Sequence, residues 1–143
     1  GTCPQIAQPS TCRFTTLTTG SDWTNFFQIE PNGTQVPADE GTSLPGVQWP
    51  FAGLIFQNSQ FQTRVGRSTE LCTRLDLRYW LCEGSFINLY NCTGVLTFEG
   101  LYDEVEEEGV YTITGGTFDF EDATGEIKDN FASFISERTI AIR

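Results

Sequence analysis

Short stretches in which apolar and polar residues alternate recur along the chain, a pattern typical of strands with one buried face. Turn residues such as Gly, Asn and Pro separate them, and no stretch carries a convincing helical period. We predict strands at 25–30, 47–56, 60–66, 71–77, 79–90, 95–99, 110–114, 131–135 and 139–143. About eight strands with short connections indicate an all-β sandwich or a closed barrel.

A pair of adjacent glycines ends the expected strand 110–114 and favours the barrel. Gly115 and Gly116 indicate either a positive φ or the close approach of another segment. Phe118 and Phe120 then alternate with carboxylates, so we expect both rings on one face of the chain. We predict that the glycines at this point form a corner, which lets the sheet bend sharply enough to close. The corner residues are Gly115, Gly116 and Gly125.

Composition narrows the classes of partner. The chain has 143 residues, enough for one core, and 19 acidic against 8 basic residues give a net charge of −11. This balance argues against nucleic acid, whose phosphates would be repelled. Histidine is absent, which removes the commonest general base and the commonest metal ligand. No apolar run is long enough for a membrane helix. We therefore expect no membrane span and no cofactor.

Five cysteines point to disulfides rather than to zinc, because no Cys-x-x-Cys pair and no histidine accompany them. Cys72 and Cys82 are equidistant from residue 77, where we expect a tight turn, so we predict that they pair across two strands. A Cys82–Cys92 bridge is the alternative. Cys3 and Cys12 are predicted to close a small loop in an N-terminal arm, residues 1–12, ahead of a barrel domain over 13–143. Cys92 is then the odd cysteine.

Two N-glycosylation sequons accompany the cysteines, at Asn32-Gly33-Thr34 and Asn91-Cys92-Thr93. Together they favour a secreted, extracellular glycoprotein. The start at Gly1-Thr2-Cys3 is what a mature chain would show after removal of a leader.

Few side chains are candidates for chemistry. Glu30 could be a pocket acid whose pKa is raised by an apolar cavity, or only the polar end of a strand. Hard oxygen donors cluster in the acidic run of residues 103–108, where calcium could bind, although a mutually repelling surface loop is the simpler interpretation. The weak calcium candidates are Asp103, Glu104 and Glu106.

A resemblance to a known family emerges around the glycine pair. Ile113-Thr114-Gly115-Gly116-Thr117, with Phe120, Ala123 and Gly125 after it, resembles the signature shared by plant dirigent proteins and allene oxide cyclases. Residues 94–100, 65–72 and 49–51 resemble segments that precede this signature. The resemblance covers about residues 26–128. It implies an eight-stranded antiparallel barrel with an apolar central cavity, in a family that often forms trimers.

The positions that depart from the family shape the functional hypotheses. Gly53, Gln57 and Asn58 stand where these families carry a substrate-positioning asparagine or aspartates. Because an amide cannot act as a general acid, we expect a non-catalytic module that self-associates in an extracellular filament, coat or wall. Residues 1–12 and 139–143 would be its joining strands. The alternatives are a cofactor-free cyclase or isomerase acting on a hydrophobic substrate, or a carrier of a small apolar ligand. An acid deep in a substantial cavity would favour the isomerase.

Overall fold

Ten strands form one antiparallel sheet in the computed structural model, which describes residues 12–23, 27–132 and 135–143. None of the helices in these ranges is long and apolar enough to cross a membrane. The strands are β1 Leu17–Trp23, β2 Phe27–Ile29, β3 Gln35–Pro37, β4 Gln48–Phe56, β5 Arg64–Arg74, β6 Tyr79–Ile87, β7 Val95–Asp103, β8 Glu108–Gly116, β9 Gly125–Ala132 and β10 Ile135–Ile142. Short 3-10 helices are η1 Ala38–Glu40, η2 Leu89–Asn91 and η3 Phe118–Phe120.

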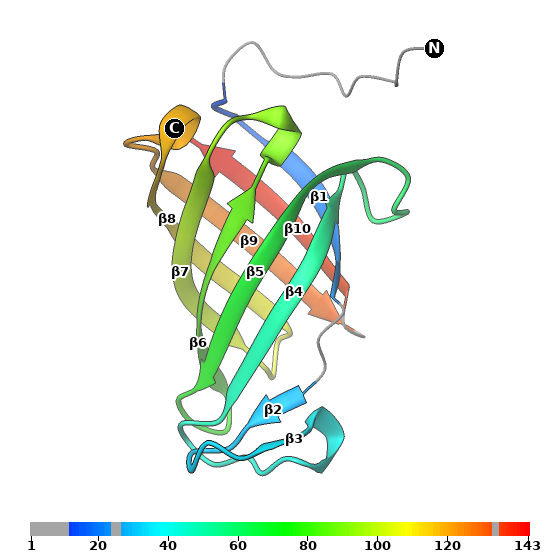
Figure 1. The fold of residues 1–143 in the computed structure, drawn as a ribbon, viewed down its shortest axis with the longest axis vertical. Coiled ribbons are helices and arrows are strands. Elements are labelled where there is room, and N and C mark those ends of the chain that lie inside the picture. Colours follow the sequence, from blue (N-terminus) through cyan, green and yellow to red (C-terminus); the bar gives the residue numbers. More distant parts are fainter. Residues whose placement is uncertain (1–11, 24–26, 133–134) are drawn as a thin grey trace.

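Eight of these strands close into a barrel (Figure 1). The sheet runs in the order β1-β10-β9-β8-β7-β6-β5-β4, and β1 also pairs with β4, from Gly20 opposite Phe56 to Trp23 opposite Gly53. The hairpin of β2 and β3 extends the sheet beyond one end of the barrel, where Ile29 pairs with Gln48. The predicted eight-stranded antiparallel barrel is therefore confirmed.

Several expected strand boundaries are wrong. The stretches 60–66 and 71–77 both overlap one long strand, β5 Arg64–Arg74, which contains residues 64–66 of the first and 71–74 of the second. The expected strand 131–135 instead spans the connection between β9 and β10, which pair from Ala132 opposite Ile135. The inward face of β10 begins with Ser136 and Arg138, which are both buried. Because these inward residues are polar, the alternation of apolar and polar residues does not indicate a strand at this point.

The glycines of the corner lie where β8 ends and β9 begins. Gly115 and Gly125 have φ values of +136° and +134°, which side chains rarely adopt. At Gly116 a glycine is required by the close approach of another segment, because a Cβ there would meet the main-chain oxygen of Val95 and the Cβ of Phe120. The expectation for the two phenylalanines is wrong: they lie in η3, with Phe118 76% exposed and Phe120 fully buried.

Substituting Gly125 by alanine (Gly125→Ala) should destabilise the barrel more than the same change at Gly33. Both have positive φ, but at Gly33 (φ +88°) a Cβ meets nothing within 4 Å, whereas at Gly125 it would meet the main-chain oxygen of Ala141 on β10. We expect a loss of about 1 kcal/mol for Gly33→Ala from strain alone and about 3 kcal/mol for Gly125→Ala from strain plus overlap. Urea unfolding measures both losses, and equal ones would contradict the close packing of the corner against β10.

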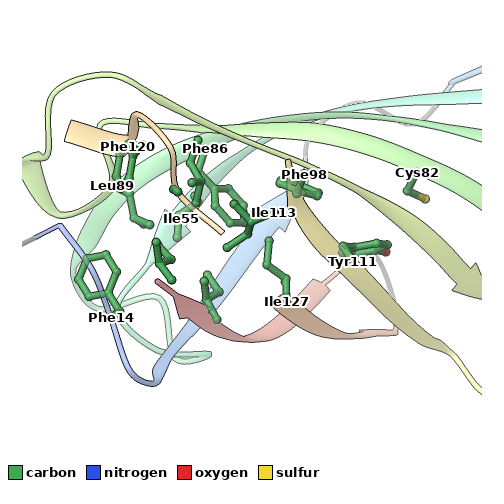
Figure 2. Packing of buried hydrophobic residues seen from close by; sticks show 14 of the residues in the cluster. Phe14, Ile55, Cys82, Phe86, Leu89, Phe98, Tyr111, Ile113, Phe120 and Ile127 are labelled. Atoms are coloured by element: carbon green, nitrogen blue, oxygen red, sulfur yellow. The ribbon is translucent and has the colours of Figure 1, made fainter. Parts of the chain in front are cut away.

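Large apolar side chains fill one end of the barrel (Figure 2). Phe14, Leu89 and Phe120 come from the segments that cross this end, and they cover inward-facing residues of the strands. Each fully buried side chain of this size contributes about 1.5–3 kcal/mol of transfer free energy. Below them lie Ile55, Phe86, Leu96, Phe98, Ile113, Ile127 and Ile140.

Two disulfides join the described residues. Cys72 and Cys82 are direct cross-strand partners on β5 and β6 and form the predicted bridge. The prediction that Cys12 pairs with Cys3 and leaves Cys92 free is wrong, because Cys12 bonds to Cys92. The segment before β1 crosses the filled end of the barrel, where Phe14 contacts Tyr90 of η2, and this brings Cys12 to Cys92. Cys3 lies outside the described residues. Disulfides are compatible with an extracellular location.

Candidate functional site

A cavity of about 220 Å³ occupies the end of the barrel opposite the filled end. Its lining residues come from the end of β1, the starts of β4 and β6, and strands β5, β7, β8, β9 and β10. All three tryptophans of the chain are among the lining residues. The aromatic part of the lining is Trp23, Trp49, Phe51, Trp80, Tyr102, Tyr111 and Phe131, and the charged part is Glu70, Glu104, Glu107, Asp129 and Arg138.

The aromatic side chains form a nearly continuous wall. Phe51 is the hub, with ring centroids 5.5 Å from Trp23, 5.9 Å from Trp49 and 5.8 Å from Phe131. Trp49 also meets Trp80 edge to face at 5.7 Å. Tilted and edge-to-face rings at these distances stabilise one another, so the wall is held in place before any ligand enters.

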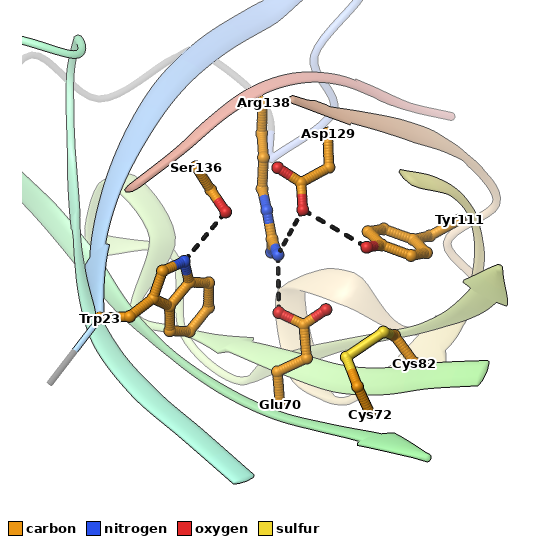
Figure 3. The surroundings of a disulfide bond; sticks show 8 residues. All are labelled: Trp23, Glu70, Cys72, Cys82, Tyr111, Asp129, Ser136 and Arg138. Atoms are coloured by element: carbon orange, nitrogen blue, oxygen red, sulfur yellow. Dashed lines mark hydrogen bonds and ion pairs between the residues drawn. A yellow bond between two sulfur atoms is a disulfide. The ribbon is translucent and has the colours of Figure 1, made fainter. Parts of the chain in front are cut away.

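A buried charged network lies at the inner end of the cavity (Figure 3). Nη2 of Arg138 on β10 donates to Oε2 of Glu70 on β5 at 2.6 Å and to Oδ2 of Asp129 on β9 at 3.1 Å. The hydroxyl of Tyr111 on β8 donates to the same Asp129 oxygen at 3.3 Å. The alternation of the strands turns all four side chains inward.

Aromatic rings surround the rest of the Arg138 guanidinium. Its Nε and Nη1 have no hydrogen-bond partner among the described residues. Four rings lie 5.1–5.7 Å from the guanidinium carbon, a range in which a cation is attracted to a ring. Burial alone would lower the pKa of Arg138, but the carboxylates of Asp129 and Glu70 raise it, so the group stays charged. The rings belong to Trp23, Phe86, Phe98 and Tyr111.

Glu70 is the side chain best placed to move a proton. Burial raises its pKa; Arg138 opposes this rise, and the nearby carboxylate of Asp129 adds to it. The loss of water around the buried carboxylate is the physical basis of this direction, because burial disfavours the charged form. Oε1 of Glu70 accepts no hydrogen bond from the described residues, and in Figure 3 it is the Glu70 oxygen without a dashed line. Glu70 can therefore hold a proton at the wall of an aromatic cavity.

Tyr111 completes the network as a hydrogen-bond donor. Burial, followed by the charges of Glu70 and Asp129, raises the pKa of Tyr111 well above its ordinary value, so the hydroxyl stays protonated. Trp23 has a separate partner, because its Nε1 donates to Oγ of Ser136 at 2.9 Å. These bonds fix the walls on both sides of Arg138.

The weak catalytic candidate Glu30 lies outside the set of residues that line the cavity. Its Oε1 accepts from the Thr42 amide at 2.8 Å and from Nε2 of Gln28 at 3.0 Å. The hydrogen bonds from Thr42 lower the pKa of Glu30, the opposite of what a pocket acid needs. The role of Glu30 is structural: Gln28, which it holds, accepts from Nε1 of Trp49 at 2.6 Å and so positions one wall of the cavity.

The first two residues of the acidic run pair with arginines. Asp103 forms a two-pronged pair with Arg78, and Glu104 pairs with Arg74 at 3.0 Å. Across the described residues, no cluster of potential metal ligands includes Asp103, Glu104 and Glu106 together. The structure therefore gives the calcium hypothesis no support.

Both sequon asparagines are exposed. Asn32 lies in a turn where its Oδ1 accepts from the amide of Thr34, and Asn91 ends η2 next to the bridged Cys92. Glycosylation at either residue stays a prediction.

No protein-family model matches this sequence, and no curated protein matches it. Solved structures do match, among them one named pyocyanin demethylase. It superimposes with a TM-score of 0.67 at 17% sequence identity, over 90% of this chain and 99% of that one. The likeness establishes a shared barrel fold. It extends over nearly the whole of both chains.

Proposed function

We propose that this protein binds a small planar aromatic compound in the barrel cavity and transfers a proton to it from Glu70. It would thus act as a cofactor-free isomerase or cyclase. The observation that carries the proposal is a buried acid with a raised pKa on the wall of an aromatic cavity. An acid held in its protonated form by its surroundings is how proteins prepare a general acid without a cofactor.

Each part of the site has a role in this chemistry. Glu70 donates its proton to an oxygen or nitrogen of the bound ring, and the carboxylate that results is stabilised by Arg138 at 2.6 Å. Asp129 holds Arg138 in place from the other side, and the Tyr111 hydroxyl donates to Asp129. The aromatic wall excludes water, which strengthens these electrostatic interactions.

The comparisons support an aromatic ligand only indirectly. The structural neighbour is named for pyocyanin, and the same kind of barrel is implied by the resemblance to dirigent proteins and allene oxide cyclases. Membership of the latter families is part of the proposal. The carboxylates that those families carry on other strands would here be replaced in function by Glu70.

The proposal can be tested with 2-indanone, a neutral two-ring ketone that enolises. The protein in D2O should accelerate incorporation of deuterium beside the carbonyl, because protonation of the carbonyl oxygen by Glu70 lets the neighbouring carbon lose its proton to water. Mass spectrometry follows the exchange. We expect Glu70→Gln to lower the rate about 100-fold, as for removal of a general acid. Glu83→Gln, which removes an exposed carboxylate of β6, should leave it unchanged.

The pH dependence gives a second readout. Because the acid form of Glu70 is required and its pKa is raised, the rate should stay high above the ordinary range of a glutamate. It should then fall as the pH rises through the raised pKa. Binding of 2-indanone with no acceleration at any pH would contradict proton transfer and favour the carrier alternative.

The predicted role in extracellular assembly stays a prediction, and one of its supports is lost. Residues 139–143 are the predicted joining strand, yet all of them except Arg143 lie in β10, which pairs with β1 on one side and β9 on the other. It has no free edge to offer a neighbour. Residues 1–11 lie outside the described residues. In the described sheet, the free edge is the short strand β3, which ends at Pro37.

A further inference from the structure

The charges that line the cavity are unbalanced. Among the described lining residues there are four carboxylates and one guanidinium, that of Arg138. Arg138 is shared by the two buried carboxylates, Glu70 and Asp129. The remaining two, Glu104 and Glu107, come from the hairpin between β7 and β8, at the mouth. With a net charge of −11, the whole molecule reinforces this local excess of negative charge.

Glu107 is the carboxylate at the mouth that is free to meet a ligand. Glu104 already pairs with Arg74, whereas Glu107 is exposed and forms no ion pair with any residue that the structure describes. Glu107 and Tyr102 both line the cavity, and the charge of Glu107 contributes to the raised pKa of the Tyr102 hydroxyl after burial and the charge of Asp129. The mouth therefore combines an unpaired carboxylate with a ring surface.

The aromatic walls already attract cations within this molecule. The guanidinium of Arg74 lies 4.2 Å from the ring centroid of Trp80, and that of Arg138 lies 5.1 Å from Trp23. The faces of indole and phenol rings are electron-rich, and they bind ammonium groups as well as guanidinium groups. Aromatic walls combined with carboxylates are suited to an organic cation.

The volume sets the size of the occupant. An apolar cavity of about 150 Å³ can hold benzene. The cavity here, about 220 Å³ and open at the mouth, is therefore matched to one or two fused rings. Oε1 of Glu70, on a side chain 96% buried, lies at the inner end without a partner in the described residues.

We propose that the ligand of this cavity is an organic cation: an aromatic compound of one or two rings that carries a quaternary or protonated nitrogen. The rings lie against Trp49, Phe51 and Trp80, the charged nitrogen lies at the mouth near Glu107, and the opposite end reaches Glu70. This inference rests on the proposed function and names the class of compound that the site accepts.

The test compares probes of nearly equal shape and different charge. N-Methylquinolinium, quinoline and quinoline-3-carboxylate are titrated into the intact, disulfide-bonded protein at pH 7.5 by isothermal titration calorimetry. Because electrostatic attraction adds to ring contact, the cation should bind at least about tenfold more tightly than neutral quinoline, and the anion most weakly. The preference should shrink between 20 mM and 300 mM salt.

Two variants of the same hairpin locate the charge. Glu107→Gln should weaken binding of the cation about two- to fivefold and leave quinoline unaffected. Glu106→Gln removes the same charge from an exposed hairpin residue that does not line the cavity. It should weaken binding of the cation less than Glu107→Gln does, and it should leave quinoline unaffected. Equal effects of the two variants would overturn the placement at Glu107.

The outcomes separate this inference from the proposed function. If quinoline binds as tightly as N-methylquinolinium, or if the cation does not bind, the inference is overturned, although deuterium exchange of 2-indanone could still show proton transfer. If the cation binds with the expected preference but no exchange is accelerated, proton transfer by Glu70 is contradicted and the cation site stands.

Discussion

Replacing Arg138 with methionine (Arg138→Met) should lower the free energy of unfolding by about 3–5 kcal/mol, the usual cost of removing one partner from a buried ion pair. The guanidinium is 99% buried and is the shared partner of Glu70 and Asp129. Without it, Glu70 and Asp129 would remain in an apolar interior with no cation between them. Urea unfolding at pH 7.5 measures the loss.

Two controls isolate the charge. Adding Glu70→Gln and Asp129→Asn to Arg138→Met removes the buried carboxylates and should recover most of the stability, since neutral groups of similar shape are much cheaper to bury. The loss in Arg138→Met should also shrink as the pH falls toward 4, because Glu70, whose pKa is raised by burial, takes up a proton in the folded state. A loss below about 1 kcal/mol at pH 7.5 would mean that water reaches these carboxylates.

Removing the Cys12–Cys92 bridge with the double variant Cys12→Ser/Cys92→Ser should cost about 4.5 kcal/mol in the chain-entropy description. The reason is the sequence separation of 80 residues, which gives the bridge a large effect on the unfolded chain. The Cys72–Cys82 bridge spans 10 residues, and its removal should cost about 2.7 kcal/mol.

Comparing the two double-serine variants in one urea series tests this order. Both replace a bridge that is largely buried, so the change in side-chain polarity is similar and the loop length is the main difference. If the loss at Cys72–Cys82 were the larger one, local packing around Glu70 and Cys72 would outweigh loop length. The bridge beside the cavity would then have to be treated as part of the site.

Features that depend on neighbours in sequence could be predicted. Cys72 and Cys82 flank one turn, so their register follows from counting residues to the turn, and the alternation of apolar residues gives the strands around them. Gly115 and Gly125 signal a backbone conformation that belongs to the residue itself. The barrel follows from these local features together with the closing corner.

The site depends on contacts between residues far apart in sequence, and it could not be predicted. Glu70 and Arg138 are 68 positions apart in the sequence, and the residue pattern of neither strand indicates that the two side chains pair. A weaker signal was present: Arg138 is in phase with Ile140 and Ile142, and Asp129 is in phase with Ile127, so each charge stands at an inward position. The pairing of Cys12 with Cys92 depends on how the chain crosses the end of the barrel, and the same reason explains why it was missed.

The Cys12–Cys92 bridge also determines how the protein would respond to mechanical force. The loop it closes contains all the strands from β1 to β6. If the chain were pulled from its two ends, this segment could not extend, and only the residues outside the bridge would contribute to the stretched length. About 270 Å of extended chain would stay locked until a reductant cut the bridge. An oxidised molecule under tension would thus keep most of its chain out of the line of force.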